Sequence, residues 1–275
     1  MSDRYAVIGN PIGHSKSPQI HAAFARQTGQ DIGYDRLLAP LDGFETIVRE
    51  FFHAGGQGLN VTVPFKREAW DIVDRCEGSA LAAEAVNTIK RSGTELIGYN
   101  TDGVGLLTDL EHNLAATIAG RRVLLMGAGG ASYGVLQPLL ERRPGLLVVA
   151  NRTLDRAERL VQHFHQFHAL APQGISAKPY AALAGLQFDL VVNATSAGLE
   201  GEMPPLPDGL FAPGAVAYDK VYGRQTRFLA FAKARGAIVA DGLGLRVEQA
   251  AESFLIWRGV RPQTAPVMAQ LRSEH

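Results

Sequence analysis

Short hydrophobic runs alternate along the chain with stretches in which hydrophobic residues recur every three or four positions. Such a run, bounded by glycine or proline, is typical of a buried strand, and the longer period is typical of a helix with one buried face. In the first hundred residues the runs predict strands at 5–8, 34–38, 59–63, 86–89 and 96–97. The recurrence predicts helices that begin at Ser17, include 44–51 and cover 103–114. Alternating strands and helices indicate layered α/β sheets.

A second series of the same kind begins near Arg121. Its runs predict strands at 123–126, 146–150, 190–193, 215–219 and 237–239, with helices at 135–140, 156–167, 228–235 and, last, 248–257. The segment 203–213, with four prolines, is predicted as a loop. We therefore expect two α/β domains.

Charge and cysteine content narrow the class of protein. The 275 residues include 27 Lys and Arg and 27 Asp and Glu, so bulk charge gives no reason to expect a nucleic-acid or membrane-surface partner. The segment 123–140 carries no charge but contains several glycines and a proline, which favours a strand, a turn and a helix over a membrane span. The single cysteine, Cys76, allows no internal disulfide. We expect a cytoplasmic protein.

A glycine-rich turn follows the strand at 123–126 and opens a helix. Gly127 permits the tight turn, and Gly129 lets the backbone approach a diphosphate at the helix N-terminus. Ser132 stands where a third glycine is usual and is small enough for close packing between helix and strand. This strand, turn and helix context is the one that a dinucleotide site requires.

The end of the next strand indicates which dinucleotide is bound. An NAD site usually has Asp or Glu here to hold the ribose 2′-hydroxyl. This chain has Asn151, Arg152 and Thr153, which all donate hydrogen bonds, and Arg152 can pair with a phosphate. The sequence therefore predicts NADP(H), although Asp155 lies close by.

Polar residues gather at predicted strand ends in the first half of the chain. They are Ser15 with Ser17, Asn60 with Thr62 and Lys66, Asn87 with Thr88, and Asn100 with Thr101 and Asp102. Ligands of open α/β sheets bind at such ends. Hydroxyls, amides, one ammonium and one carboxylate suit a small, anionic, polyhydroxylated substrate.

Segments spread over nearly the whole chain resemble, in order, the motifs of the shikimate dehydrogenase family. They are 9–18 (GNPIGHSKSP), 60–66 (NVTVPFK), 85–88 (AVNT), 100–103 (NTDG), 193–196 (NATS) and 241–244 (DGLG). The resemblance implies a Rossmann-like NADP-binding domain at 102–240 and a discontinuous α/β substrate-binding domain at 1–101 that is completed by 241–275. The active site is expected in the cleft between these two domains. It also implies NADPH-dependent reduction of 3-dehydroshikimate to shikimate, on the route to aromatic amino acids.

The resemblance assigns roles residue by residue. Ser15 and Ser17 are implied to bind the substrate carboxylate. The substrate hydroxyls are implied to contact Asn60, Thr62, Asn87, Asp102 and Gln249, with Tyr222 nearby. The implied cofactor-binding residues are Gly127, Ala128, Gly129, Gly130, Ala131, Asn151, Arg152, Thr153, Ala194, Thr195, Ser196, Lys220 and Gly242. Lys66 and Asp102 are the implied catalytic pair, and Lys66 also binds substrate.

Carbonyl reduction needs such a pair. An alkoxide that forms at the ketone requires a proton and a nearby positive charge, and Lys66 can supply both. Asp102 can orient the hydroxyl and hold Lys66 charged. The sequence leaves two proton donors open, the Lys66 ammonium and a relayed water.

Two other functions fit parts of the pattern. One is a quinate/shikimate dehydrogenase that uses either cofactor, and the other is a non-catalytic regulator that binds NADP(H) or shikimate. The presence of both Lys66 and Asp102 favours an enzyme.

The chain departs from the family at Lys220 and Arg227, which replace an apolar residue and a proline. We expect no metal site, since His163, His165 and His168 do not share one helix face, and a homodimer is compatible with the pattern.

Overall fold

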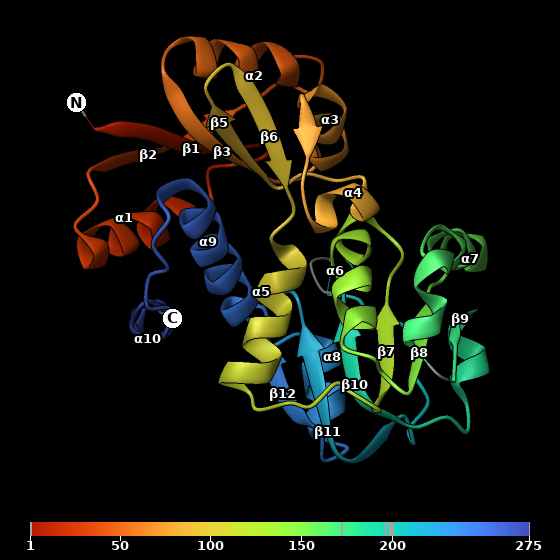
Figure 1. Cartoon of the computed structure of the whole chain (residues 1–275). Coiled ribbons are helices and arrows are strands. Elements are labelled where there is room, and N and C mark those ends of the chain that lie inside the picture. Colours follow the sequence, from red (N-terminus) through yellow and green to blue (C-terminus); the bar gives the residue numbers. More distant parts are fainter. Residues whose placement is uncertain (1, 172, 196, 198–200, 275) are drawn as a thin grey trace. The chain divides into compact units, whose positions relative to one another are not determined.

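The chain divides into two compact units, each containing one sheet of six strands. The computed structural model describes residues 2–171, 173–195, 197 and 201–274, without the side chains of 168 and 169. Unit 1 comprises Met1–Gly105 and Arg246–His275, and unit 2 comprises Leu106–Leu245 (Figure 1). Both boundaries lie inside helices, whereas the motifs suggested 101/102 and 240/241.

Unit 1 contains a mixed sheet with the strand order β2-β1-β3-β5-β6-β4. The strands are β1 (Asp3–Gly9), β2 (Ile32–Leu38), β3 (Gly56–Val61), β4 (Arg75–Cys76), β5 (Thr88–Ser92) and β6 (Glu95–Tyr99). β1 is parallel to β2 and β3, and β5 is antiparallel to β3 and β6. Ile8 and Leu59 of the sheet form one buried core with Phe44 and Val48 of the helix that follows β2.

Helices complete unit 1. They are α1 (Ser17–Thr28), α2 (Phe44–His53), α3 (Lys66–Ile72), α4 (Ser79–Ala83) and α10 (Ala265–Ser273), with α5 (Asp102–Thr108) and α9 (Leu243–Arg258) crossing the unit boundary. α1 has Pro18 in its first turn, where a missing N–H costs nothing. The expectation that 248–257 is the last helix is wrong, because α10 follows it. α3 and α4 are too short to show a hydrophobic period.

Unit 2 contains an all-parallel sheet with the order β12-β11-β10-β7-β8-β9. The strands are β7 (Arg122–Met126), β8 (Leu146–Ala150), β9 (Ile175–Lys178), β10 (Phe188–Asn193), β11 (Phe211–Asp219) and β12 (Ile238–Asp241). Renumbered within the unit, this is the doubly wound order 3-2-1-4-5-6, whose switch point lies between the first and fourth strands, here β7 and β10. The predicted α/β class with a Rossmann-like unit is confirmed.

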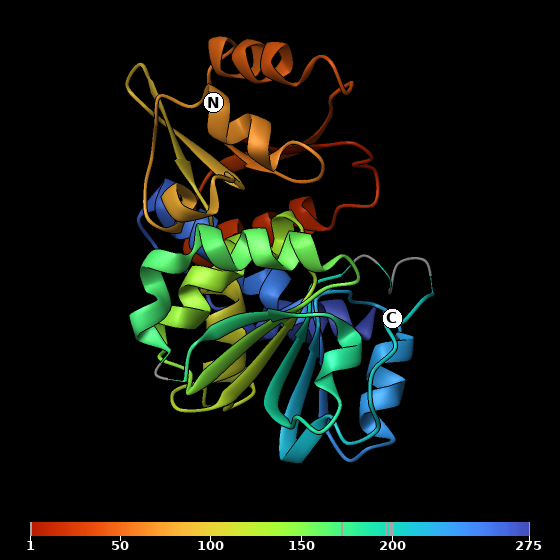
Figure 2. The same cartoon turned by 90° about the vertical axis from the view of Figure 1, so that its right-hand side faces the viewer.

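The helices of unit 2 pack on this sheet (Figure 2). They are α6 (Gly130–Glu141), α7 (Leu154–His163) and α8 (Arg227–Lys233), with a π-helical turn at Asp109–Asn113. α7 packs on β8 and β9, and α8 packs on β11 and β12. Leu124, Val148, Val191 and Ala217 are fully buried in the sheet, as the near-continuous hydrophobic runs predicted.

The predicted loop at 203–213 extends too far, since β11 already begins at Phe211. Pro213 and Gly214 are exposed within this strand. The pairing of β10 with β11 shifts its register between Phe188 and Leu190. An irregular point of this kind tolerates a proline that cannot donate a ladder hydrogen bond.

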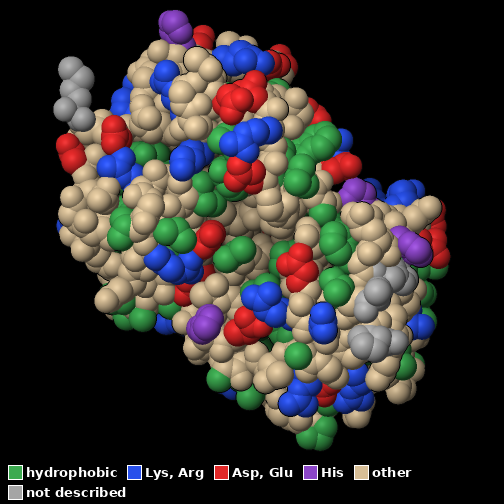
Figure 3. All heavy atoms as spheres, in the orientation of Figure 1, with side chains coloured by type: hydrophobic (Ala, Val, Ile, Leu, Met, Phe, Trp, Pro, Cys, Tyr) green, Lys and Arg blue, Asp and Glu red, His purple; other side chains and the backbone are tan. Residues whose placement is uncertain are grey.

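The surface carries charge of both signs. Figure 3 shows Lys and Arg side chains interspersed with Asp and Glu over the visible face, in keeping with a formal net charge of zero. Within the described residues, no helix is long and apolar enough to cross a membrane. The charge-free segment 123–140 forms most of β7, a turn and most of α6, as predicted.

Candidate functional site

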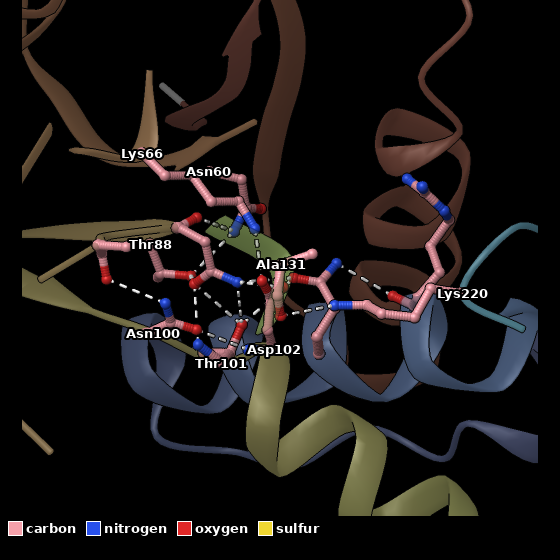
Figure 4. A network of polar contacts seen from close by, with 12 residues as sticks. Asn60, Lys66, Thr88, Asn100, Thr101, Asp102, Ala131 and Lys220 are labelled. Carbon is pink, nitrogen blue, oxygen red and sulfur yellow. Dashed lines mark hydrogen bonds and ion pairs between the residues drawn. The ribbon is translucent and has the colours of Figure 1, made fainter. Parts of the chain in front are cut away.

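The polar residues predicted to bind substrate in unit 1 stand at the ends of its elements. Asn60 lies near the end of β3, and Asn87 immediately precedes β5. Lys66 and Asp102 are the first residues of α3 and α5. Together with Gln249 of α9, they form one region of polar contacts (Figure 4).

Lys66 and Asp102 form a direct ion pair. Lys66 Nζ donates to Asp102 Oδ2 at 2.5 Å, and the two side chains are 23% and 8% exposed. The other carboxylate oxygen, Asp102 Oδ1, accepts from Asn87 Nδ2 at 3.0 Å. The backbone N–H of Asp102 donates to Asn100 Oδ1 at 3.1 Å. Lys66 and Asn87 thus hold the carboxylate, Asn100 holds the backbone of Asp102, and the ammonium is the more accessible partner of the ion pair.

Asn87 connects this pair to helix α9. Its Nδ2 also lies 3.1 Å from Thr101 Oγ1 and 3.5 Å from Gln249 Oε1, and its Oδ1 accepts from the Thr101 backbone N–H at 2.9 Å. The Thr101 hydroxyl donates to Gln249 Oε1 at 3.2 Å. Asn87, Asp102 and Gln249 are thus brought together, with Thr101 between them.

Ser253 also lies in this network, and sequence reasoning missed it. It is fully buried and accepts from Asn60 Nδ2 at 2.9 Å. Its hydroxyl is 2.8 Å from Thr88 Oγ1 and donates to the Gln249 carbonyl at 3.0 Å. The available signal was its position four residues after Gln249 in a predicted helix, which places both on one face.

Ser15 and Ser17 form a buried pair at the start of α1. Ser15 Oγ donates to Ser17 Oγ at 3.1 Å, and the Ser17 backbone N–H approaches Ser15 Oγ at 3.3 Å. Arg36 of β2, which the motifs did not include, donates to the Ser15 carbonyl from Nε at 3.0 Å and Nη2 at 2.6 Å. Two hydroxyls beside a guanidinium suit an anionic group.

The two remaining predicted substrate residues are Thr62 and Tyr222. Thr62 is half-buried immediately after β3, where its backbone N–H donates to the Ile8 carbonyl at 3.0 Å. Tyr222 is half-buried and belongs to unit 2. A substrate contact for either residue stays a prediction.

His21 of α1 is a buried titratable group that the motifs did not single out. It is fully buried, and neither ring nitrogen has a hydrogen-bond partner. Its ring stacks on Tyr34, with centroids 4.2 Å apart and planes 7° from parallel. Burial lowers the pKa of His21 to about 3, and the nearby Asn60 side chain offsets only part of this effect. The imidazole is therefore neutral in the folded protein.

We expect His21 to make the protein less stable as the pH falls from 6.5 towards 3. The unfolded chain takes up a proton in this window and the folded chain does not, so the free energy of unfolding drops by about 1.4 kcal/mol per pH unit. Urea unfolding of the wild type and His21→Leu at pH 7 and pH 5 measures the effect. The wild type should lose roughly 2 kcal/mol more than the variant between pH 7 and pH 5, and an identical pH dependence would contradict the prediction.

The glycine turn of unit 2 fits the approach of a diphosphate. Gly127 has φ +101°, and a Cβ on it would lie 3.2 Å from the Ala194 carbonyl, so only glycine suits this position. Gly129 caps α6 and Gly130 begins it, and a Cβ on either would meet nothing within 4 Å. Gly129 and Gly130 are exposed at a helix N-terminus, where an anion is favoured.

Ser132 connects the first turn of α6 to the start of the glycine turn. It is fully buried, and its hydroxyl donates to the Gly127 carbonyl at 2.8 Å. The small side chain therefore stabilises the tight turn. The predicted site residues Ala128 and Ala131 belong to the same turn and the first turn of α6.

The residues predicted to recognise a 2′-phosphate follow β8. Asn151 Nδ2 donates to the Thr153 carbonyl at 2.8 Å, and Thr153 is the N-cap of α7. Arg152 between them is exposed. Because β7 and β8 are adjacent and parallel, this loop and the glycine turn lie at the same edge of the sheet.

Three further predicted cofactor residues also follow strands of this sheet. Thr195 Oγ1 donates to Asn193 Oδ1 at 2.7 Å. Lys220 Nζ donates to the Ala131 carbonyl at 3.3 Å, beside the first turn of α6 (Figure 4). A Cβ on Gly242 would lie 2.2 Å from the Lys220 carbonyl, so these two backbones are in close contact. Ser196 lies outside the described residues.

Comparison with known proteins identifies the family. Residues 7–89 match the family model described as the shikimate dehydrogenase substrate binding domain, and residues 109–199 match the one described as shikimate / quinate 5-dehydrogenase. A protein from Alkalilimnicola ehrlichii named shikimate dehydrogenase (NADP(+)) is 59% identical, over 100% of both chains. The chain belongs to the shikimate dehydrogenase family.

Solved structures agree with this assignment. The crystal structure of an Ael1 enzyme from Pseudomonas putida matches with a TM-score of 0.91 and 45% identity, covering 98% of each chain. Shikimate 5-dehydrogenase from Thermus thermophilus, solved in complex with NADP(H) and shikimate, matches with a TM-score of 0.87 and 33% identity, covering 98% of this chain and 99% of that one. The family resemblance drawn from the motifs is confirmed.

Membership of the shikimate dehydrogenase family also accounts for the two sheets. The segment matched by the substrate-binding model lies within unit 1, and the segment matched by the second model lies within unit 2. The polar network around Lys66 and the glycine turn after β7 therefore belong to different functional parts of the family's fold.

Proposed function

We propose that this chain is an NADP-dependent shikimate dehydrogenase, which reversibly reduces 3-dehydroshikimate to shikimate in aromatic amino acid biosynthesis. The observation that carries the proposal is the 2.5 Å ion pair of Lys66 and Asp102 within a network of neutral amides and hydroxyls. Such a site offers one mobile proton and many neutral hydrogen-bonding groups, as reduction of a polyhydroxylated ketone requires.

In the proposed mechanism Lys66 acts at the substrate oxygen. Its ammonium stabilises the negative charge that develops on the carbonyl oxygen and gives that oxygen a proton. Asp102 keeps the ammonium charged and directs it, while Asn87 and the Asp102 backbone contact to Asn100 prevent the carboxylate from turning away. In the reverse direction Lys66 takes the proton back from the hydroxyl.

Substrate binding divides between two polar clusters of unit 1. The buried pair of Ser15 and Ser17 is proposed to bind the carboxylate, with the Arg36 guanidinium adding positive potential. The hydroxyls are proposed to contact Asn60, Thr62, Asn87, Asp102, Gln249 and Tyr222. Neutral donors and acceptors bind hydroxyls without the desolvation cost of further charges.

The glycine turn and the strand ends of unit 2 are proposed to bind NADP(H). Gly127, Gly129 and Gly130 would accommodate the diphosphate, and Asn151, Arg152 and Thr153 the 2′-phosphate. Ala194, Thr195, Lys220 and Gly242 would line the rest of the site. The bound reduced nicotinamide supplies the hydride that the carbonyl carbon accepts.

A spectrophotometric assay tests the proposal. Purified protein is mixed with shikimate or quinate and with NADP⁺ or NAD⁺, and the absorbance of the reduced cofactor is followed at 340 nm. We expect turnover with shikimate and NADP⁺. Turnover with quinate or with NAD⁺ at a comparable rate would favour a quinate/shikimate dehydrogenase of dual cofactor use. Binding of both ligands without turnover would favour a regulator.

We expect Arg152→Ala to weaken NADP⁺ binding more than NAD⁺ binding. A charge-assisted contact to a phosphate contributes roughly 1.5–3 kcal/mol, which corresponds to about a 10- to 100-fold rise in KM for NADP⁺. Arg156→Ala, one turn into α7, is a control that removes a nearby arginine outside the predicted set. Equal losses for both cofactors would mean that Arg152 does not contact the 2′-phosphate.

We also propose that the protein is cytoplasmic and that it can form a homodimer. The free thiol of the single cysteine, Cys76, suits a reducing compartment. Light scattering during size-exclusion chromatography measures the oligomeric state, and fractionation of the source cells measures the location.

A further inference from the structure

The side-chain amide of Asn60 is held at both ends by other residues of unit 1. Its Oδ1 accepts from the Tyr34 hydroxyl at 2.7 Å. Its Nδ2 faces three acceptors, which are Ser253 Oγ at 2.9 Å, Thr88 Oγ1 at 3.1 Å and the Asn87 carbonyl at 3.3 Å. An amide nitrogen has only two hydrogens to give, so both are used within the protein.

Tyr34 and Ser253 are themselves firmly placed. The Tyr34 ring stacks on the fully buried His21, with ring centroids 4.2 Å apart. The fully buried Ser253 donates to the Gln249 carbonyl at 3.0 Å, one turn back on α9. The two groups therefore hold the amide from β2 and from α9, two segments far apart in the sequence.

We infer that Tyr34 and Ser253 are positioning residues that fix the orientation of the Asn60 amide, so that Asn60 meets the substrate as a hydrogen-bond acceptor. With both N–H groups used, Oδ1 is the part of the amide that retains capacity for another bond. A substrate hydroxyl can donate to it, whereas a ketone or ether at that position cannot. This inference rests on the proposed function. It explains why the site would select a substrate that carries a hydroxyl at the position facing Asn60 Oδ1.

The Asn87 carbonyl decides which way the amide is turned. The hydroxyls of Ser253, Thr88 and Tyr34 can each donate or accept, so by themselves they satisfy the amide in either orientation. The Asn87 carbonyl only accepts, which keeps Nδ2 on its side and leaves Oδ1 to accept from the Tyr34 hydroxyl. Without the Tyr34 hydroxyl, Oδ1 loses this donor, and the amide is held less firmly in the orientation that presents Oδ1 to the substrate.

The test is steady-state kinetics of Tyr34→Phe with shikimate and NADP⁺. We expect KM for shikimate to rise about fivefold, the size of one neutral hydrogen bond, with kcat and KM for NADP⁺ within about twofold of the wild type. Tyr5→Phe is the matched control, because Tyr5 is a buried tyrosine of the same unit whose hydroxyl contacts Arg258 instead. It should lower the melting temperature similarly and leave KM for shikimate unchanged.

A second variant tests whether both residues act through one amide. Ser253→Ala should raise KM for shikimate by a smaller factor, since Thr88 and Asn87 still accept from Nδ2. The double variant Tyr34→Phe/Ser253→Ala should raise KM by less than the product of the single factors. Independent effects that multiply would overturn the inference.

Deoxy derivatives of shikimate identify the hydroxyl concerned. For one of them, the ratio of KM between Tyr34→Phe and wild type should fall to about one, because the contact that the amide makes is already missing. A ratio that stays at fivefold for every derivative, or a Tyr34→Phe variant with unchanged KM, overturns the inference. Absence of shikimate turnover in the wild type would instead reject the proposed function.

Discussion

Replacing Lys66 with alanine should lower kcat for shikimate oxidation by on the order of 100-fold or more. The variant loses both the proton donor and the charge next to the reacting oxygen, and each such contribution is typically about 10²-fold or larger. Shikimate binding should weaken far less, because the serine pair and the amides remain. The measurement is kcat and KM for the wild type and the variant.

Two further variants make this test specific. Lys90→Ala removes a partly buried lysine of β5 in the same unit, and it should keep kcat within about twofold of the wild type if the effect belongs to Lys66. Lys66→Arg keeps a positive charge but is a very poor proton donor. Strong loss in Lys66→Arg indicates proton transfer from Lys66, and near-normal turnover indicates a water relay beside a fixed charge. Normal turnover of Lys66→Ala would exclude Lys66 from the mechanism.

The fold of unit 2 could be predicted because its signals are local. Near-continuous hydrophobic runs mark strands buried on both faces, and Gly127 marks the turn after the first of them. The chain order of strands and helices then leaves few topologies. Helix α10 escaped prediction because it is short, and only Val267 and Leu271 of its nine residues are buried, which is too few to mark a clear period.

The site could be predicted only where residue type and spacing are distinctive. Lys66 and Asp102 stand in motifs that differ from ordinary turns, and the structure joins them although 36 positions separate them. Tyr34 and Ser253 carry no such signal. A tyrosine in a strand and a serine in a helix are usual there, and their importance arises from contacts with Asn60 that only the tertiary structure creates.

Gly244→Ala should destabilise unit 2 despite the better helix propensity of alanine. Gly244 is the second residue of α9, and a Cβ there would lie 1.9 Å from Asp109 Oδ1. The buried Asp109 carboxylate cannot easily give way, since Oδ2 accepts from the Tyr218 hydroxyl at 2.6 Å and Oδ1 from Asn113 Nδ2 at 2.9 Å. Burial and the adjacent Asp109 raise the pKa of Tyr218, so its hydroxyl stays a donor.

The expected loss of stability in Gly244→Ala is the balance of opposing effects. Alanine gains up to about 1 kcal/mol of helix propensity over glycine. Overpacking costs about 1–3 kcal/mol, and a displaced buried carboxylate loses hydrogen bonds worth a similar amount. The net loss of about 2–4 kcal/mol should lower the melting temperature of unit 2 by roughly 5–10 °C. Gly209→Ala is the control, because a Cβ there meets nothing within 4 Å. Adding Gly244→Ala to an Asp109→Ala variant should lower the free energy of unfolding only slightly further. A further loss as large as in the wild-type background would show that Asp109 is not what obstructs the added Cβ.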